Sequence, residues 1–220
     1  MATSTVEDYL KAIYSQQQRG GGGLVAMGAL AAAMNVAPGT ATAMVKTLAD
    51  AGLVDYEPRG GVKLGSKGEK LALHVLRRHR LVELFLVEVL GLDWSEVDPE
   101  AEELEHAISD KVLAKIDELL KHPKVDPHGD PIPTSAGKVT NRALESLMEC
   151  ELHRPVRVAR VMDQNPRFLQ FIDRHNLKPG TELIVKQRDE QADAVDIRPR
   201  HQQPLTLGRA AAAKILVETV

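Results

Sequence analysis

Cysteine and aromatic residues are scarce in this chain of 220 residues. The single cysteine, Cys150, excludes a disulfide framework and any zinc or iron–sulfur site built from several cysteines. Because only 3% of the residues are aromatic, the core must consist mainly of leucine, valine, isoleucine and alanine. No apolar run reaches the ~18–20 residues that span a membrane, and no signal peptide opens the chain. We therefore expect a soluble, cytoplasmic protein.

The charge of the chain is unevenly distributed, although its net value is only −3. Residues 1–78 carry +3, residues 79–150 carry −9, and residues 151–220 carry +3. The basic first third permits a polyanionic partner, and the acidic middle third, with four of the eight histidines, permits a cation site. Solvated helix faces would give the same asymmetry, so the function has to be inferred from the spacing of residues.

Apolar periodicity predicts helices through most of the first two thirds. Proline, glycine and capping residues set their ends, with Thr5 capping the first helix, a Ser66–Glu69 capping box, an Asp98–Pro99 start and Ser109 as a cap. The expected helices cover residues 4–17, 25–34, 38–51, 66–90, 98–108, 109–120 and, as a short segment, 139–149. Residues 122–137 contain four prolines and no periodicity, which indicates a rigid loop.

Short β-like runs occur in two places. Leu53–Glu57 and Val62–Gly65 flank a glycine-rich turn and predict a hairpin. After Pro155, five further runs and one helix at 166–175 predict a small β-barrel with a helical insertion. The runs are Val156–Val161, Glu182–Val185, Val195–Ile197, Leu205–Leu207 and Ile215–Val217.

Two short helices followed by a hairpin with a basic tip describe a winged helix–turn–helix. A recognition helix needs small or polar side chains at its exposed start to approach bases and phosphates. Arg59 at the hairpin tip, with Lys63 and Lys67 nearby, forms the expected wing. Alternatively, the winged helix could serve protein packing or dimerisation instead of DNA binding. The expected DNA-binding residues are Ala37, Pro38, Gly39, Thr40, Thr42, Ala43, Lys46 and Arg59.

Carboxylates and histidines recur at helical spacing in the acidic third. Glu102, Glu105 and His106 share one helix face, as do His79 and Glu83 on the preceding helix. With Asp8 from the first helix, these side chains from three helices could converge on one or two divalent ions. Oxygen and imidazole ligands suit Mn²⁺ or Fe²⁺. Such spacing also occurs on solvated helix faces, so it does not by itself establish a metal site.

Six segments together make the chain resemble the diphtheria toxin repressor family of metal-dependent transcriptional repressors. The segments are VEDYLKAIY (6–14), the winged segment, RHRLVE (78–83), GLDW (91–94), EAEELEHAISD (100–110) and HGDPIP (128–133). The resemblance extends over essentially the whole chain, including LKPGTEL (177–183) near its end. It implies a mainly α fold with a small β part. The expected domains are a winged helix at 1–72, a helical metal-binding and dimerisation domain at 73–150, and an SH3-like (FeoA-like) barrel at 151–220.

The resemblance also implies a ligand set. Asp8, Glu102, Glu105 and His106 would form the primary site, and His79 and Glu83 a second one beside it. The iron branch of the family has Met and Cys at the positions of Asp8 and Glu102, so carboxylates there favour the manganese branch. Asp98 stands where the iron branch has a histidine. Asp163, or Gln164, is the expected ligand from the barrel.

These observations predict a homodimer that binds double-stranded operator DNA when it is loaded with Mn²⁺, or with Fe²⁺ as the alternative. It would control genes for metal transport. A binuclear metal hydrolase is the rival from another class, but the chain has no phosphate loop, nucleophile elbow or HExxH motif. A metal-independent regulator that binds a small molecule in the barrel is a second rival. We therefore expect no enzyme.

Overall fold

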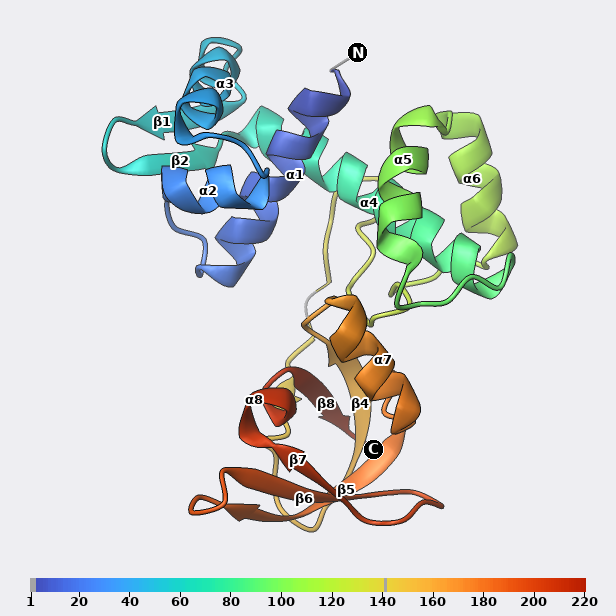
Figure 1. Cartoon of the computed structure of the whole chain (residues 1–220). Coiled ribbons are helices and arrows are strands. Elements are labelled where there is room, and N and C mark those ends of the chain that lie inside the picture. Colours follow the sequence, from blue (N-terminus) through green and yellow to red (C-terminus); the bar gives the residue numbers. More distant parts are fainter. Residues whose placement is uncertain (1–2, 141) are drawn as a thin grey trace. The chain divides into compact units, whose positions relative to one another are not determined.

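A computed structural model describes residues 3–140 and 142–220 (Figure 1). Backbone contacts divide the chain into two units. The first extends to His79 and also includes Pro133–Val139, whereas the second contains Arg80–Ile132 and Thr140–Val220. In the described ranges no helix is both long and apolar enough to cross a membrane.

The first unit is a winged helix–turn–helix, as expected. Its elements are α1 (Ser4–Arg19), α2 (Met27–Ala33), α3 (Pro38–Asp50), β1 (Val54–Glu57), β2 (Gly61–Leu64) and the first turns of α4 (Ser66–Glu88). The two strands are antiparallel, with Val54 opposite Leu64. Its core contains almost only aliphatic side chains, among them Leu10, Ile13, Leu30, Val45 and Leu48.

The ends of the helices test the predicted caps. Pro38 begins α3, at the start of the helix predicted over 38–51, and Gly52 follows its end with φ +67°. The predicted Thr5 cap is wrong, because the hydroxyl of Thr3 accepts from the backbone N–H of Val6. Helix α1 therefore starts one residue before Thr5, and Thr5 lies inside it.

Helices form the first part of the second unit. It holds the rest of α4 together with α5 (Val97–Ala107) and α6 (Asp110–Leu119). Ser109 caps α6 by accepting from Val112, as predicted. The predicted Asp98 cap is wrong, because α5 already begins at Val97 and Asp98 lies in its first turn. The helices pack through aliphatic residues, among them Leu81, Val82, Leu86, Leu113 and Ile116.

The rest of the second unit is a six-stranded antiparallel sheet with two short helices. The strands are β3 (Glu145–Ser146), β4 (Pro155–Val161), β5 (Glu182–Asp189), β6 (Ala194–Pro199), β7 (Leu205–Gly208) and β8 (Ile215–Thr219), in the order β3-β8-β4-β5-β6-β7. Helix α7 (Pro166–Arg174) follows β4, and α8 (Arg209–Ala212) precedes β8. The helix predicted at 139–149 is wrong over the described residues, which include β3 instead.

Trp94 connects the helical part of the second unit to its sheet. It lies in the loop after α4, is almost fully buried, and belongs to the apolar cluster formed by the sheet. The partly buried side chain of Val87 on α4 packs against the same cluster. The loop that contains Trp94 therefore packs against the barrel.

Candidate metal centres and DNA interface

One helical turn of α5 carries three of the predicted ligands. Glu102, Glu105 and His106 offer ligand atoms that lie within 4.8 Å of one another. We call these three residues the α5 group. Glu105 is fully buried, and its Oε1 lies 3.4 Å from Nε2 of His106. Asp8 lies half-buried on α1 in the first unit.

Glu83 on α4 is the centre of the second predicted site. His79 lies one turn earlier on the same helix, so their side chains share a face, and both are buried. Asp98, in the first turn of α5, brings a ligand atom within 4.8 Å of Glu83 but is exposed.

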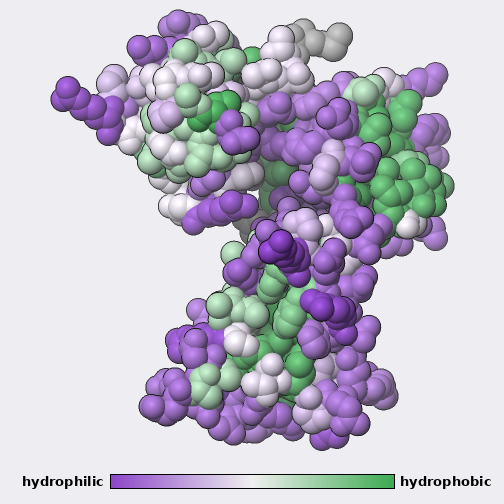
Figure 2. Space-filling model, viewed as in Figure 1, coloured by the Kyte–Doolittle hydropathy of each residue, from purple (hydrophilic) through white to green (hydrophobic). Residues whose placement is uncertain are grey.

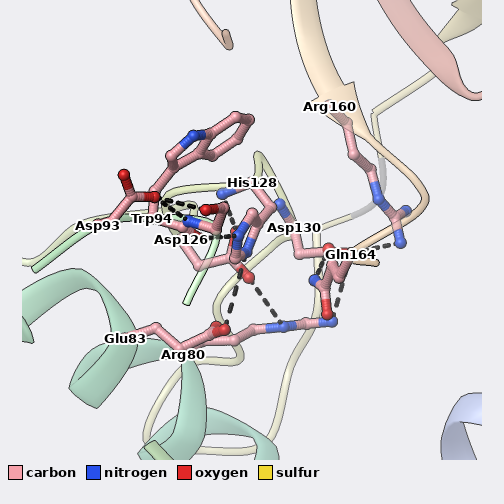
Figure 3. Close-up of polar contacts among 10 residues, drawn as sticks. Arg80, Glu83, Asp93, Trp94, Asp126, His128, Asp130, Arg160 and Gln164 are labelled. Carbon is pink, nitrogen blue, oxygen red and sulfur yellow. Dashed lines mark hydrogen bonds and ion pairs between the residues drawn. The ribbon is translucent and has the colours of Figure 1, made fainter. Parts of the chain in front are cut away.

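Asp126 and His128 are site residues that the sequence analysis missed. Their ligand atoms and that of Glu83 lie within 4.8 Å of one another, and all three side chains are at most 3% exposed. We call these residues the buried group; Figure 3 shows Asp126 and His128 in a loop above Glu83 on α4. The D-x-H spacing of Asp126 and His128 is the sequence signal for them, whereas the prolines around it indicate only a rigid loop.

The tautomer of a neutral His128 ring follows from its contacts. Its Nε2 lies 2.9 Å from the backbone carbonyl oxygen of Trp94, which can only accept, so Nε2 must donate. In the neutral ring Nδ1 therefore carries a lone pair, and it lies 3.7 Å from Oε1 of Glu83. Nδ1 has no hydrogen-bond partner among the described residues. Two electron-pair donors that face each other in a buried position fit a cation between them.

The two carboxylate oxygens of Asp126 have different surroundings. Its Oδ1 accepts from the backbone N–H groups of His128 and Asp130, both at 2.9 Å, and so shapes the loop. Its Oδ2 has no hydrogen-bond partner among the described residues, although Nε of Arg80 lies 3.5 Å away. Burial raises the pKa of Asp126 well above the usual value, and the nearby Asp130 and Glu83 raise it further. A divalent cation at this position would relieve that penalty.

The expected ligands from the barrel are bound to other groups. Oδ2 of Asp163 lies 2.7 Å from Nζ of Lys214, and Oδ1 accepts from the N–H of Asn165. Gln164 donates to Asp130 at 3.1 Å. Neither residue belongs to a ligand group found in the described part of the chain.

The expected DNA-binding residues lie along the start of α3 and at the tip of the β1–β2 hairpin. Residues 37–40, Ala43 and Lys46 are exposed. Thr42 is half-buried and donates its hydroxyl hydrogen to the carbonyl oxygen of Pro38 at 2.8 Å. Arg59 is exposed at the tip of the hairpin, and its backbone φ is +68°. Nζ of Lys63 lies 3.9 Å from Oδ2 of Asp55 on the neighbouring strand.

A winged helix–turn–helix joined to a unit rich in divalent-cation ligands defines the class of metal-responsive DNA-binding proteins. Three family models match the chain in succession. They describe the N-terminal DNA-binding domain of iron-dependent repressors (1–62), their metal-binding and dimerisation domain (66–134), and the FeoA domain (145–219). The chain belongs to the diphtheria toxin repressor family, whose members are metal-dependent transcriptional repressors.

Individual relatives include iron- and manganese-dependent regulators. The iron-dependent repressor IdeR of Mycobacterium tuberculosis is 36% identical over 129 residues, which are 59% of this chain and 55% of that protein. The diphtheria toxin repressor of Corynebacterium diphtheriae is 28% identical over 84% of this chain and 85% of its own length. The structure of a manganese-dependent transcriptional repressor in complex with manganese is 37% identical, covers 98% of this chain and 100% of its own, and has a TM-score of 0.87. The relatives thus confirm the predicted family and fold.

Proposed function

We propose that this chain is a manganese-responsive repressor that binds operator DNA as a homodimer when loaded with divalent metal. Its targets would be genes for metal-ion transport, and it would act in the cytoplasm. The observation that carries the proposal is the α5 group, in which two carboxylates and one imidazole meet within 4.8 Å around the buried Glu105. Manganese-dependent repressors among the relatives of similar structure support the same metal.

The chemistry of the ligands favours a hard cation. Both groups offer only carboxylate oxygens and imidazole nitrogens, which suit Mn²⁺ and Fe²⁺. The one thiol, that of Cys150, lies in the core of the barrel, and burial raises its pKa, so it is not available as a thiolate ligand. We propose Asp8 as the fourth ligand of the α5 group, through which the ion would hold α1.

A second ion is proposed at the buried group. Glu83 belongs both to this group and to the group with His79 and Asp98, so its carboxylate can bridge two positions. Nδ1 of His128 and Oδ2 of Asp126 are buried and have no hydrogen-bond partner among the described residues. They therefore favour the buried group over the group that contains the exposed Asp98 as the position of this ion. Asp163 and Gln164, which interact with Lys214 and Asp130, are not needed as ligands in this assignment.

Metal binding would regulate DNA binding by fixing α1 relative to α5. The recognition helices α3 of a dimer must match successive major grooves, about 34 Å apart. An ion shared by Asp8 and the α5 group would favour that arrangement, whereas repulsion between the carboxylates would disfavour it without the ion. A ~100-fold change in DNA affinity corresponds to about 2.8 kcal/mol of coupling, and DNA would tighten metal binding by the same factor.

The DNA contacts would come from α3 and the hairpin. Residues 37–40, Thr42, Ala43 and Lys46 would enter the major groove, and Arg59 would contact the backbone or the minor groove. Because residues 37–46 contain no Arg, Asn or Gln, direct bidentate reading of bases is not available to the recognition segment. Specificity would then depend on methyl contacts, on DNA shape and on Arg59.

The test is a titration of DNA binding with Mn²⁺, with Fe²⁺ under anaerobic conditions and with Zn²⁺, each compared with a chelated control. The probe is the promoter of a neighbouring metal-transporter gene. We expect Glu105→Ala to abolish metal-dependent DNA binding while the dimer stays folded. Glu103 is an exposed glutamate on the same helix, and Glu103→Ala should leave metal-dependent DNA binding intact. Manganese-responsive gel shifts that persist in Glu105→Ala would contradict the proposal.

Iron is the second candidate metal, because iron-dependent repressors are among the relatives. The same titration decides between the two metals. If anaerobic Fe²⁺ activates DNA binding at a lower concentration than Mn²⁺ does, the chain is an iron-responsive repressor. If Mn²⁺ is the more effective activator, the manganese assignment holds.

A further inference from the structure

Asp130 lies four residues after Asp126 and is buried, yet it belongs to none of the ligand groups found in the described part of the chain. Its Oδ1 lies 3.4 Å from Nη2 of Arg80 and also forms an ion pair with Nη2 of Arg160. Its Oδ2 accepts from Nε2 of Gln164 at 3.1 Å. Figure 3 shows this carboxylate between α4, which carries Arg80, and the segment that carries Arg160 and Gln164.

We propose that Asp130 is a positioning residue that prepares the buried group for a metal ion and couples that ion to strand β4. Asp130, Arg80, Arg160 and Gln164 are called the Asp130 latch below. The proposal rests on the second ion proposed above at Glu83, Asp126 and His128. It assigns a function to four residues that are not ligands.

The first part of the argument concerns the position of the loop. The backbone N–H of Asp130 donates to Oδ1 of Asp126, and the backbone N–H of Asp126 donates to the carbonyl oxygen of Asp130. Arg80 also donates to the carbonyl oxygen of Pro131, so the loop is attached to α4 directly after Asp130. Fixing Asp130 therefore fixes Asp126 and His128 over Glu83. Residues that orient ligands in this way are typical of metal sites.

The second part of the argument concerns charge. Nε of Arg80 lies 3.5 Å from Oδ2 of Asp126, and the positive charge of this guanidinium could there replace that of a metal ion. Asp130 binds the same guanidinium through Nη2 and so provides it with another anionic partner. If Asp130 were replaced by asparagine, Arg80 would pair with Asp126 alone and compete with the ion. Asp130 thus shares the guanidinium of Arg80 with Asp126, so that Arg80 does not pair with Asp126 alone.

The third part of the argument concerns β4. Arg160 lies on this strand, and the N–H of Val161 donates to the carbonyl oxygen of His128 at 2.9 Å. A Cβ atom on Gly129 would overlap the carbonyl oxygen of Ala159, so the loop and the strand are in close contact. An ion that orders His128 and Asp126 would therefore also order β4. By reciprocity, stabilising β4 would strengthen metal binding.

The experiment uses the full chain carrying Glu105→Ala, which inactivates the α5 group and leaves the buried group intact. Trp94 is the only tryptophan, and its ring centroid lies 5.3 Å from that of His128, so its fluorescence reports an ion at His128. We expect Mn²⁺ to quench this fluorescence. Adding Asp130→Asn should weaken the Mn²⁺ affinity by about 10- to 100-fold, as is usual for residues that support metal ligands.

Asp196→Asn is the matched control, because it makes the same chemical change on β6 at a carboxylate that pairs with Thr206. It should leave the Mn²⁺ affinity unchanged. Since Asp130→Asn could disturb folding, Gln164→Ala supplies a milder test, as it removes one contact of Asp130 from a half-buried position. It should weaken Mn²⁺ binding without changing the unfolding midpoint of the metal-free chain.

Hydrogen exchange provides an independent readout of the coupling. Mn²⁺ should slow the exchange of amides in β4 in the Glu105→Ala chain, and Asp130→Asn should remove this protection. Equal Mn²⁺ affinity with and without Asp130→Asn would overturn the latch while leaving the second ion in place. No quenching in the Glu105→Ala chain would overturn both the latch and the second ion. The co-repressor role of the α5 group is tested separately by the DNA titration.

Discussion

Burial divides the proposed metal ligands into two kinds. Glu83, Glu105, Asp126 and His128 are almost inaccessible, whereas Asp98 is exposed and Glu102 is half-buried. A buried carboxylate is costly unless it is paired or hydrogen-bonded. The inaccessible ligands therefore gain most from a cation, and their replacement should have the largest effect on metal-dependent behaviour.

The stability of the metal-free protein should depend on pH through Asp126. An aspartate in an unfolded chain ionises near pH ~3.9, whereas burial raises the pKa of Asp126 in the fold. The folded protein thus binds this proton more tightly, so stability from this group is full below pH ~4 and is lost as pH rises through the raised pKa. We expect the free energy of unfolding, measured with chelator, to fall with pH more steeply in the parent than in Asp126→Asn. Parallel pH profiles would contradict this prediction.

Gly129 should be intolerant of any side chain. It has φ +88°, and a Cβ atom would overlap the carbonyl oxygen of Ala159 on β4. We expect Gly129→Ala to lower the free energy of unfolding by about 1–3 kcal/mol, as measured by denaturant titration. Gly28→Ala is the control, because that helical position has open space around it and should be neutral or stabilising. Equal effects of the two substitutions would show that the close contact is unimportant.

The helices and strands were largely predictable, because most carry a clear apolar period. Apolar positions at helical spacing correctly predicted α1 to α6, and the short β runs predicted β4 to β8. The errors lie where local signals compete: Thr3 and Thr5 are both possible caps, and Asp98–Pro99 resembles a helix start although α5 begins earlier. Strand β3 is two residues long and pairs with β8, far along the chain, so no local pattern predicts it.

The candidate site was predictable only where its residues share a helix. Glu102, Glu105 and His106, like His79 and Glu83, are related by helical spacing, so periodicity alone places them together. Asp126 and His128 meet Glu83 across more than 40 residues of sequence, through a loop without regular structure. Their contact depends on how the loop packs against β4, and periodicity contains no information about such packing.

The wing should contribute charge to DNA binding. Arg59 is exposed at the tip of the β1–β2 hairpin. We expect Arg59→Ala to weaken operator binding at every sequence tested and to reduce the slope of log affinity against log salt by about 1, because one phosphate contact is lost. Arg209→Ala, an exposed arginine of the barrel, is the control. An unchanged salt slope in Arg59→Ala would exclude a phosphate contact by the wing.

The assembly should depend on the hydrophobic surface over α5 and α6. Figure 2 shows apolar side chains gathered there, and Leu104, Val112 and Leu119 are exposed. We expect Leu119→Glu to give monomers in sedimentation velocity and to weaken operator binding, because a dimer contacts two half-sites. Leu152→Glu, at an exposed leucine outside this surface, should leave the dimer intact. A dimeric Leu119→Glu variant would place the interface elsewhere.

The family models divide the chain into three segments, and backbone contacts divide it into two units. The predicted boundaries at 72 and 150 stay a prediction. Helix α4 begins in the first unit and continues into the second, so the boundary between the two units lies inside this helix.

The segment Pro133–Val139 belongs to the first unit although it follows 53 residues of the second, Arg80–Ile132. The polypeptide thus passes between the units three times, after His79, after Ile132 and after Val139. A protease that cuts after Ile132 or after Val139 leaves the two units covalently joined, and a cut after His79 leaves residues 133–139 of the first unit on the other fragment. A fragment that ends at residue 79 lacks part of its own unit. The DNA-binding part of this protein is therefore not a module that a single cut can release, and recombination at one point cannot transfer it intact to another protein.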